Sequence, residues 1–342
     1  MSIATSAPGK LVLLGEYAVL DGAPALVLAV NRRANATLTP IPGDCFEIIS
    51  PTLGMAARLR PGDGAAHRRG PAPPAELAWI ATLLAHFGPA RTLPACRVEL
   101  DSDAFYVDHA GARVKLGLGS SAALAVALLG ALRALAQLPP PALAEAIAMH
   151  RAIQGGRGSG IDIAASLAGG LTRFQLDAAG AAHATPASLP RGLHMCCVYS
   201  GRPASTRAML AEVAAWRTHA PGAYTRHIRE LATISSRGVD AVATGDAAAF
   251  LSSLSAYAQT LARFGHACGV DIASREHQTI GAIATDCGCV YKSCGAGGGD
   301  VGITFGVDNH RVQVFASRAA RAGFRVIGLE ADPRGLGMMV NV

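Results

Sequence analysis

The first third of the chain carries short apolar runs separated by turn-forming residues. Runs of this length, rich in Val, Leu, Ile and Ala, are typical of β-strands in a buried sheet. We therefore expect strands at residues 11–14, 25–30, 36–40, 46–49 and 97–100. Before the last of these, the Gly-, Pro- and Arg-rich stretch from Pro61 to Pro74 predicts a loop.

Helical periodicity first appears between residues 76 and 87. The apolar side chains that would share one helix face there are Leu77, Ile80, Leu83, Leu84 and Phe87. A Gly-rich turn further along leads into a second predicted helix, from residue 121 to about residue 137. Pro139–Pro141 end that helix and begin another, which we expect to run to Ile153.

The stretch 177–191 is poor in long apolar side chains and contains Ala, Gly and Pro. We place a domain boundary there and divide the chain into residues 1–185 and 186–342. For the second part we expect a strand at 193–199, helices between 206 and 284, a strand at 301–305, a helix at 311–322 and a strand at 324–329. Strands and helices are mixed without strict βαβ alternation, so the predicted fold class is α+β rather than a doubly wound sheet.

Composition narrows the class of protein. Apolar residues make up 51% of the 342 residues and charged residues 16%, which excludes a disordered chain. Mean hydropathy is +0.31, but the longest suspicious stretch, Ala122–Leu132, has only about half of the ~20 apolar residues that a membrane span needs. The N-terminus has no signal-peptide pattern. We expect a cytoplasmic protein with no membrane partner.

The eight cysteines should then be mostly reduced. Cys287, Cys289 and Cys294 are close in sequence, but their spacing is not one of the usual zinc patterns, and a buried free cysteine often acts as a small apolar side chain. The formal net charge of +6 suits an anionic partner. Because the basic residues are scattered and aromatic residues are few, we expect a small molecule rather than nucleic acid. A monomer and a homodimer both remain open.

The most informative stretch is Gly117–Ala123, which reads G-L-G-S-S-A-A. Glycines let a backbone turn tightly near a ligand, and the helix that follows offers free N–H groups and a positive dipole end to a phosphate. Ser120 and Ser121 add hydroxyls that suit a phosphate oxygen or a magnesium ion. The stretch is neither a Walker loop nor G-x-G-x-x-G, because Ala122 holds the last position. A Gly-Ser turn that only caps an Ala-rich helix is the alternative.

A second polar segment, Gly158–Asp162, precedes a small apolar helix. Asp162 could orient or deprotonate a substrate hydroxyl near the phosphate loop. A carboxylate in the first turn of a helix is also a common stabilising charge, so the structural interpretation stays open.

Two further segments are rich in glycine or carry an early lysine. Lys292–Asp300 holds four glycines in five residues, a pattern that permits close backbone contact with a ligand or serves a long hairpin connection. Pro8–Lys10 is followed by Gly15–Tyr17, and Lys10 could equally be a solvated surface charge.

In order and spacing, these four segments resemble the signature of the GHMP kinases: P-G-K…G-E-[YH]-[AT]-V-L, then G-L-G-S-S-A-A, then K-x-x-G-A-G-G-G-D. Within that superfamily the details are similar to the phosphomevalonate kinases. Tyr17 stands where mevalonate kinases usually have His, and Gly158–Asp162 is similar to G-S-G-F-D, with Ile161 for Phe. Residues 199–206 resemble a T-G-x-P-A-S-T segment, and Lys115 matches a basic position of the family.

The resemblance implies a fold with an N-terminal ribosomal-S5-like domain, a C-terminal ferredoxin-like domain and an active site between them. It implies ATP and Mg²⁺ as cofactors, with magnesium near Ser120 or Ser121. The ATP phosphates would lie on Gly117, Leu118, Gly119, Ser120, Ser121, Ala122 and Ala123. The catalytic residues would be Asp162, Lys10 and Lys115.

By the same resemblance, ten residues would bind substrate: Glu16, Tyr17, Ser159, Gly160, Ser205, Thr206, Gly295, Ala296, Gly297 and Gly298. Among them, Ser205 and Thr206 would line the acceptor side, and the glycines from 295 onward would close over the phosphate loop. The implied reaction is ATP-dependent phosphorylation of 5-phosphomevalonate to 5-diphosphomevalonate, in the mevalonate route to isoprenoids. A mevalonate kinase or another GHMP kinase is the nearest alternative. Diphosphomevalonate decarboxylases usually carry a K-Y-W-G-K stretch, which is absent here. A ligand-sensing relative without turnover is a further alternative.

Overall fold

The structure is a computed structural model that describes residues 2–60, 72–87, 93–156 and 158–341, with only the backbone of residues 339–341. Most of the loop that we predicted from Pro61 to Pro74 lies outside the described residues. No helix in these ranges is long and apolar enough to cross a membrane.

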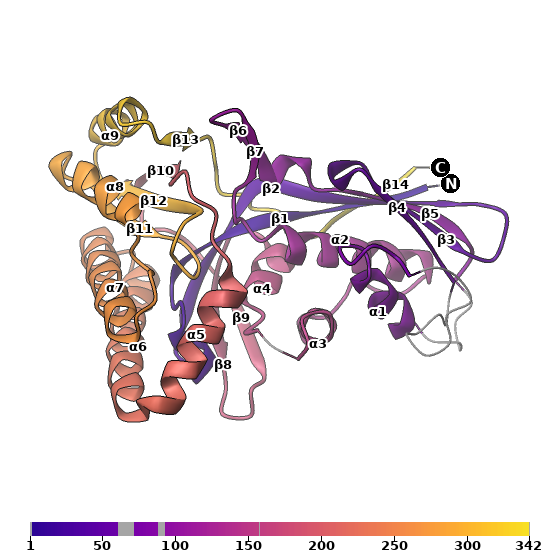
Figure 1. Ribbon diagram of the computed structural model, residues 1–342, viewed down its shortest axis with the longest axis horizontal. Helices are drawn as coiled ribbons and strands as arrows, with labels where there is room; N and C mark the ends of the chain where they lie inside the picture. The colour runs from indigo at the N-terminus through magenta and orange to yellow at the C-terminus, as the bar shows by residue number, and fades with distance from the viewer. Residues whose placement is uncertain (1, 61–71, 88–92, 157, 342) are drawn as a thin grey trace.

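An eight-stranded sheet runs through the first half of the molecule (Figure 1). Its order is β14-β1-β2-β5-β3-β4, and β8 pairs with the other end of β2 and carries β9 at its edge. The strands are β1 (Ser2–Leu14), β2 (Ala25–Pro40), β3 (Phe46–Ser50), β4 (Met55–Leu59), β5 (Cys96–Asp101), β8 (Leu171–Leu176), β9 (Ala182–Ala187) and β14 (Gly337–Asn341). Short 3-10 helices occur at η1 (Ala18–Asp21), η2 (Pro51–Leu53) and η3 (Asp103–Phe105).

The two strands that we predicted at 25–30 and 36–40 are one strand, β2. Polar residues between them, such as Asn31, interrupt the apolar pattern, but the strand continues past them. Along β1 the register shifts between Pro8, which pairs with Arg33, and Gly9, which pairs with Val30. This bulge takes up the extra residues of β2, so the strand bends and continues.

Helices cover one face of the large sheet (Figure 1). They are α1 (Trp79–His86), α2 (Ser120–Leu135), α3 (Leu143–Ile153) and α4 (Ile161–Ala168). The Ala-rich sequence of α2 lets it lie close to β1, where the Thr5 hydroxyl donates to the Ala127 carbonyl over 2.7 Å. The predicted helices at 76–87, 121–137 and up to Ile153 are confirmed within a few residues at their ends.

A four-stranded antiparallel sheet forms the second half, in the order β11-β12-β10-β13. Its strands are β11 (Val290–Ser293), β12 (Val301–Gly306), β10 (His194–Tyr199) and β13 (Arg325–Ile327). One face packs through Val198 against α8 (Arg275–Asp286) and α9 (Asn309–Arg321). The other packs against α7 (Ala247–Cys268), where Phe250 and Phe305 make an edge-to-face contact, and α5 (Thr206–His219) and α6 (Pro221–Thr244) lie beside it (Figure 1).

The fold class is α+β, as predicted. Residues 182–187, inside the stretch where we placed a domain boundary, form β9 and pair with β8. The chain end also returns to the first sheet, since β14 pairs with β1 and the two termini lie side by side (Figure 1). The division into residues 1–185 and 186–342 stays a prediction.

A hairpin that we did not predict connects the two halves. It consists of β6 (Tyr106–His109) and β7 (Ala112–Lys115), and it leads directly into the Gly-rich turn before α2. The His109 ring packs edge-to-face on Tyr199 of β10, with ring centroids 5.4 Å apart. Arg325 of β13 donates to the Asp108 carbonyl. The hairpin therefore fixes the start of α2 relative to the second sheet.

A buried ion pair forms the second connection. Glu16, just after β1, accepts from the Lys292 ammonium of β11, and the two side chains are only 3% and 0% exposed. Tyr257 of α7 donates to the Glu16 carbonyl over 2.7 Å. Two opposite charges withdrawn from water stabilise a fold only while both are present, because either one alone keeps its full desolvation cost.

We therefore expect Glu16→Gln to destabilise the protein strongly, by about 3–5 kcal/mol, since it leaves the Lys292 charge buried without its counter-ion. The double variant Glu16→Gln/Lys292→Met should recover part of that loss. Glu47→Gln is the control, because Glu47 pairs with Arg58 at the surface and should change little. Urea unfolding of the four proteins measures this. Equal stability of Glu16→Gln and the unmodified chain would contradict the structural role of the pair.

Candidate active site

The Gly117–Ala123 stretch forms a tight loop that ends at the N-terminus of α2. Gly117 and Gly119 have φ of 69° and 79°, a left-handed conformation that glycine adopts without strain. Ser120 is the first residue of the helix and is buried, whereas Ser121 is exposed. Neither hydroxyl hydrogen-bonds to a described residue. The loop thus presents free hydroxyls and helix N–H groups at the positive end of a 16-residue helix.

Lys10 of β1 runs along this loop. Its backbone N–H donates to the Leu118 carbonyl over 2.8 Å. A Cβ at Gly119 would lie 3.1 Å from Cγ and Cε of Lys10, and one at Gly295 would lie 3.9 Å from Nζ. The ammonium group therefore lies between the Gly117–Ala123 loop, called the phosphate loop below, and the Gly-rich loop at residues 294–300, called the C-terminal loop. The sequence indicated that Lys10 belongs to the site but not where it lies in it.

Lys115, the last residue of β7, and Asp300, at the end of the C-terminal loop, lie near the same place. Desolvation lowers the pKa of Lys115, although much of this side chain is exposed, and the Asp300 carboxylate opposes the shift. The Asp300 side chain lies directly against Gly117 and leaves no room for a Cβ there. In the sequence, Asp300 is only the last residue of the Lys292–Asp300 pattern, and no role was predicted for it because no local signal marks this contact.

Asp162 lies in the first turn of α4. Its Oδ1 accepts from the Ile163 N–H over 3.0 Å, and Ser166, one turn later, donates to the Pro8 carbonyl over 2.8 Å. The second bond holds α4 against β1 two residues before Lys10. Within the described ranges no ion pair joins Asp162 to Lys10, so the structure brings their elements together without pairing their charges.

The loop before Asp162 is shaped by α3. The Arg151 guanidinium donates to the Gly158 carbonyl over 3.0 Å and to the Ser159 carbonyl over 3.3 Å. The Ser159 hydroxyl accepts from the Ile161 N–H over 3.3 Å. Gly160 has φ of 89°, and a Cβ there would lie 2.7 Å from Ile147. Close packing therefore explains this glycine without any ligand.

Glu16 and Tyr17, which we expected to bind substrate, lie beneath the C-terminal loop. Glu16 is held by Lys292, and the Tyr17 hydroxyl donates to the Ala296 carbonyl over 2.6 Å. Burial raises the pKa of Tyr17, so its hydroxyl keeps the proton that it donates. In the structure these two side chains contact the C-terminal loop and the strand before it, and substrate binding by either stays a prediction.

The C-terminal loop is braced from the other side by α8. Gly298 donates to the Ile272 carbonyl over 2.8 Å, and His277 Nε2 lies 2.8 Å from the Gly299 carbonyl. A carbonyl only accepts, so Nε2 carries the proton and Nδ1 accepts from the Tyr291 hydroxyl at 2.6 Å. Burial lowers the pKa of His277, which keeps the ring neutral.

Ser205 and Thr206 lie at the start of α5, and both are exposed. The Ser205 hydroxyl accepts from the Ala208 N–H over 3.3 Å, which is an ordinary helix cap. The backbone just before them is tied to the C-terminal loop, because Ser200 N–H donates to the Asp300 carbonyl over 2.9 Å. This places the 200–206 segment beside the loop.

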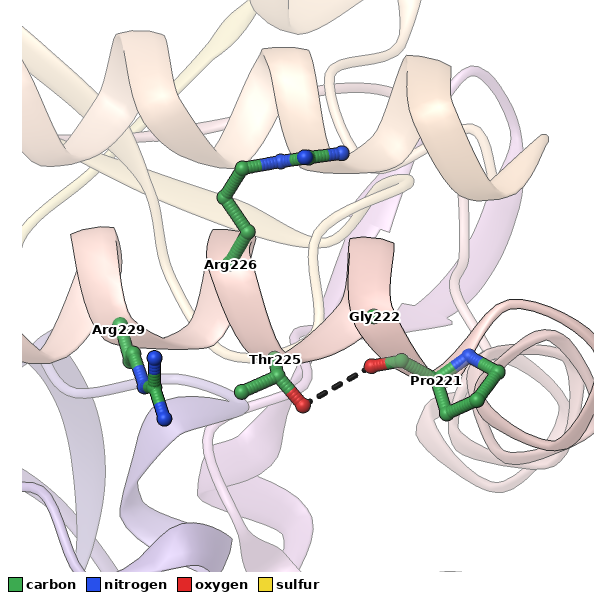
Figure 2. Close-up of a pocket in the computed structure, with 5 residues that line it drawn as sticks. All are labelled: Pro221, Gly222, Thr225, Arg226 and Arg229. Carbon is green, nitrogen blue, oxygen red and sulfur yellow. Dashed lines mark hydrogen bonds between the residues drawn. The ribbon is translucent and has the colours of Figure 1, made fainter.

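The described residues outside these motifs provide weaker candidates for a functional site. Figure 2 shows a hollow on the outer surface of α6, lined by Pro221, Gly222, Thr225, Arg226 and Arg229, and none of the motif residues reaches it. Among the described residues, no three His, Cys, Asp or Glu side chains group as metal ligands. Cys287 and Cys289 are buried at the turn between α8 and β11.

Comparison with known proteins gives matches of three kinds. Residues 77–170 match the GHMP kinases N terminal domain. The chain is 30% identical to the phosphomevalonate kinase of Streptomyces sp. strain CL190 over 344 residues, which covers 88% of this chain and 89% of that enzyme. It is 33% identical to the mevalonate kinase of Archaeoglobus fulgidus over 129 residues, covering 38% and 37%. A solved structure, Streptococcus pneumoniae phosphomevalonate kinase in complex with phosphomevalonate and AMPPNP, has a TM-score of 0.78 at 20% identity, covering 96% and 99%.

The structural match shows a shared fold, and the Streptomyces match extends over nearly the full length of both sequences. Two of the motifs on which the resemblance is based, the Gly117–Ala123 loop and the C-terminal loop, both lie beside Lys10. This chain belongs to the GHMP kinases and is a phosphotransferase.

Proposed function

We propose that the chain transfers the γ-phosphoryl group of ATP to the phosphate of 5-phosphomevalonate and forms 5-diphosphomevalonate and ADP. The observation that carries this proposal is the 30% identity to a phosphomevalonate kinase over nearly the whole length of both chains. A bond forms between an acceptor phosphate oxygen and the γ-phosphorus, and the bond from that phosphorus to the β,γ-bridging oxygen breaks.

The charge arrangement supports a phosphorylated acceptor. Two unit negative charges 4 Å apart repel by about 4 kcal/mol at an effective dielectric constant of about 20, so joining two phosphates needs fixed positive charge. Lys10 lies between the phosphate loop and the C-terminal loop, and Lys115 ends β7, two residues before the phosphate loop begins. Both cations would act on the oxygens of the transferring group or of the acceptor.

The nucleotide would bind at the start of α2. Glycines at 117 and 119 allow close backbone approach, and the helix N-terminus attracts phosphate. The free hydroxyls of Ser120 and Ser121 fit a Mg²⁺ ion bound with the nucleotide, and such an ion would supply further neutralisation of phosphate charge.

Phosphorylation of mevalonate is the second candidate, favoured by the shorter match to the Archaeoglobus enzyme. That acceptor reacts through a hydroxyl, which must lose a proton. A phosphate monoester has its second pKa near ~6 and is largely ionised at neutral pH, so it needs little help from a base. The two acceptors therefore place different demands on Asp162.

With Mg²⁺ and ATP, the purified protein should phosphorylate 5-phosphomevalonate faster than mevalonate, because both lysines face a second phosphate only with the first acceptor. Coupled ADP release with a panel of 5-phosphomevalonate, mevalonate, homoserine and galactose measures this. A preference for any of the other three would reject the acceptor while leaving the family assignment intact.

Asp162→Asn should lower kcat for 5-phosphomevalonate by up to about a hundredfold, because we expect Asp162 to orient the acceptor. A larger loss, toward ~10⁴-fold, would indicate general-base catalysis. Thermal unfolding is measured beside turnover, and Asp246→Asn is the control, since Asp246 caps α7 through the Ala249 N–H. If Asp162 only stabilises its helix, Asp162→Asn will lose about 0.3–1 kcal/mol of stability through the helix dipole and keep full turnover. Asp246→Asn should keep both its stability and its turnover, because an Asn oxygen still caps α7.

Ser121→Ala should raise the KM for ATP without lowering the melting temperature, because its exposed hydroxyl makes no bond to a described residue. Gly119→Val should be more damaging, since a branched side chain cannot adopt φ of 79° easily and would press on Lys10. Ser252→Ala, at an exposed position of α7, is the matched control. An unchanged KM for ATP in Ser121→Ala would remove that hydroxyl from the nucleotide site.

A further inference from the structure

Asp300 has a backbone conformation that its residue type rarely adopts. Its φ is 58°, in the left-handed region, where a non-glycine residue bears a cost of order 1 kcal/mol or more. Glycine would adopt this conformation freely, and the preceding residues of the loop are glycines. The side chain of Asp300 therefore has to offset this cost through its contacts.

The backbone and side chain of Asp300 contact two separate segments. The Asp300 N–H donates to the Arg202 carbonyl over 2.7 Å, and its carbonyl accepts from the Ser200 N–H over 2.9 Å. Its carboxylate Oδ1 accepts from the Ala204 N–H over 3.2 Å. The same carboxylate packs against Gly117. One side chain thus touches the phosphate loop and the 200–206 segment at once.

The loop that carries Asp300 is held firmly on its other side. His277 fixes the Gly299 carbonyl, and a Cβ at Gly299 would press on the Arg202 carbonyl. Burial raises the pKa of the Asp300 carboxyl, and the Ala204 N–H, Lys10 and Lys115 oppose this shift. The carboxylate is therefore partly withdrawn from water and lies beside both cations of the site.

We propose that Asp300 is a positioning residue for phosphoryl transfer, whose carboxylate couples the phosphate loop to the 200–206 segment. The inference rests on the proposed function, which puts the nucleotide on the first of these segments, and on the family resemblance, which implies that the acceptor lies near the second. When the carboxylate is removed, the two segments lose their shared contact and the two substrates lose alignment. A misplacement of about 1 Å can cost on the order of a hundredfold in rate.

Two substitutions separate this role from that of a simple turn residue. Asp300→Gly relieves the backbone cost but removes the carboxylate. Asp300→Asn keeps the size and an oxygen that can accept from the Ala204 N–H. Gln137→Gly is the control, because Gln137 also has a positive φ, 56°, but lies beyond the far end of α2.

We expect Asp300→Gly to lower kcat/KM for the acceptor by about tenfold or more, with the Kd for ADP changed by less than about threefold and the melting temperature held within a few degrees. Asp300→Asn should recover most of the loss, and Gln137→Gly should match the unmodified chain. Full activity in Asp300→Gly would overturn the proposal, as would an Asp300→Asn variant no better than Asp300→Gly.

The unmodified chain is assayed first with the acceptor panel, so the two hypotheses can fail separately. If it prefers another acceptor, the proposed function is wrong and the Asp300 comparison is made with that acceptor. An unaffected Asp300→Gly variant with the preferred acceptor overturns the positioning role alone.

Discussion

The buried pair of Glu16 and Lys292 joins the two sheets beside the candidate active site. The first residue follows a strand of the large sheet, and the second lies on an edge strand of the small sheet. This bond lies next to the C-terminal loop, which begins directly after β11, and so helps to fix that loop relative to β1, the strand that carries Lys10. Tyr17 extends the same connection by holding the Ala296 carbonyl. A site assembled from both halves of a chain depends on such connections between them.

The sequence predicted those elements whose information is local. Apolar runs and helical periodicity located β3, β5, β10, β12 and the helices α1 to α3 within a few residues. These patterns missed the strands that form because a neighbouring strand pairs with them and not because their own sequence is apolar. β9 is rich in Ala and includes a proline, and β7 is largely exposed, so neither carries the apolar alternation of a buried strand. β2 was divided in two because the polar residues at its bulge look like a turn.

The candidate site shows the same difference between local features, which the sequence predicts, and long-range contacts, which it does not. The Gly-rich loop and the helix after it could be predicted, because glycine conformation and helix ends are properties of a few neighbouring residues. The contact of Asp300 with Gly117 joins positions far apart in the chain, as does the pair of Glu16 and Lys292, and no local pattern encodes either. Glu16 and Tyr17 illustrate the limit, since the structure shows their contacts with the C-terminal loop and the strand before it, and substrate binding by either stays a prediction. A sequence motif marks residues that matter, without distinguishing those that touch a ligand from those that hold the backbone around it.

The return of the chain end to the first sheet has a consequence for how the protein is made. β14 lies at one edge of that sheet, along β1, and it covers the backbone groups that β1 would otherwise expose. While the ribosome is still adding the second half, β1 has an open edge that can pair with another strand. The large sheet is complete only after residues 337–341 have left the ribosome, so a stalled or shortened chain presents an aggregation-prone surface although most of its helices can already form.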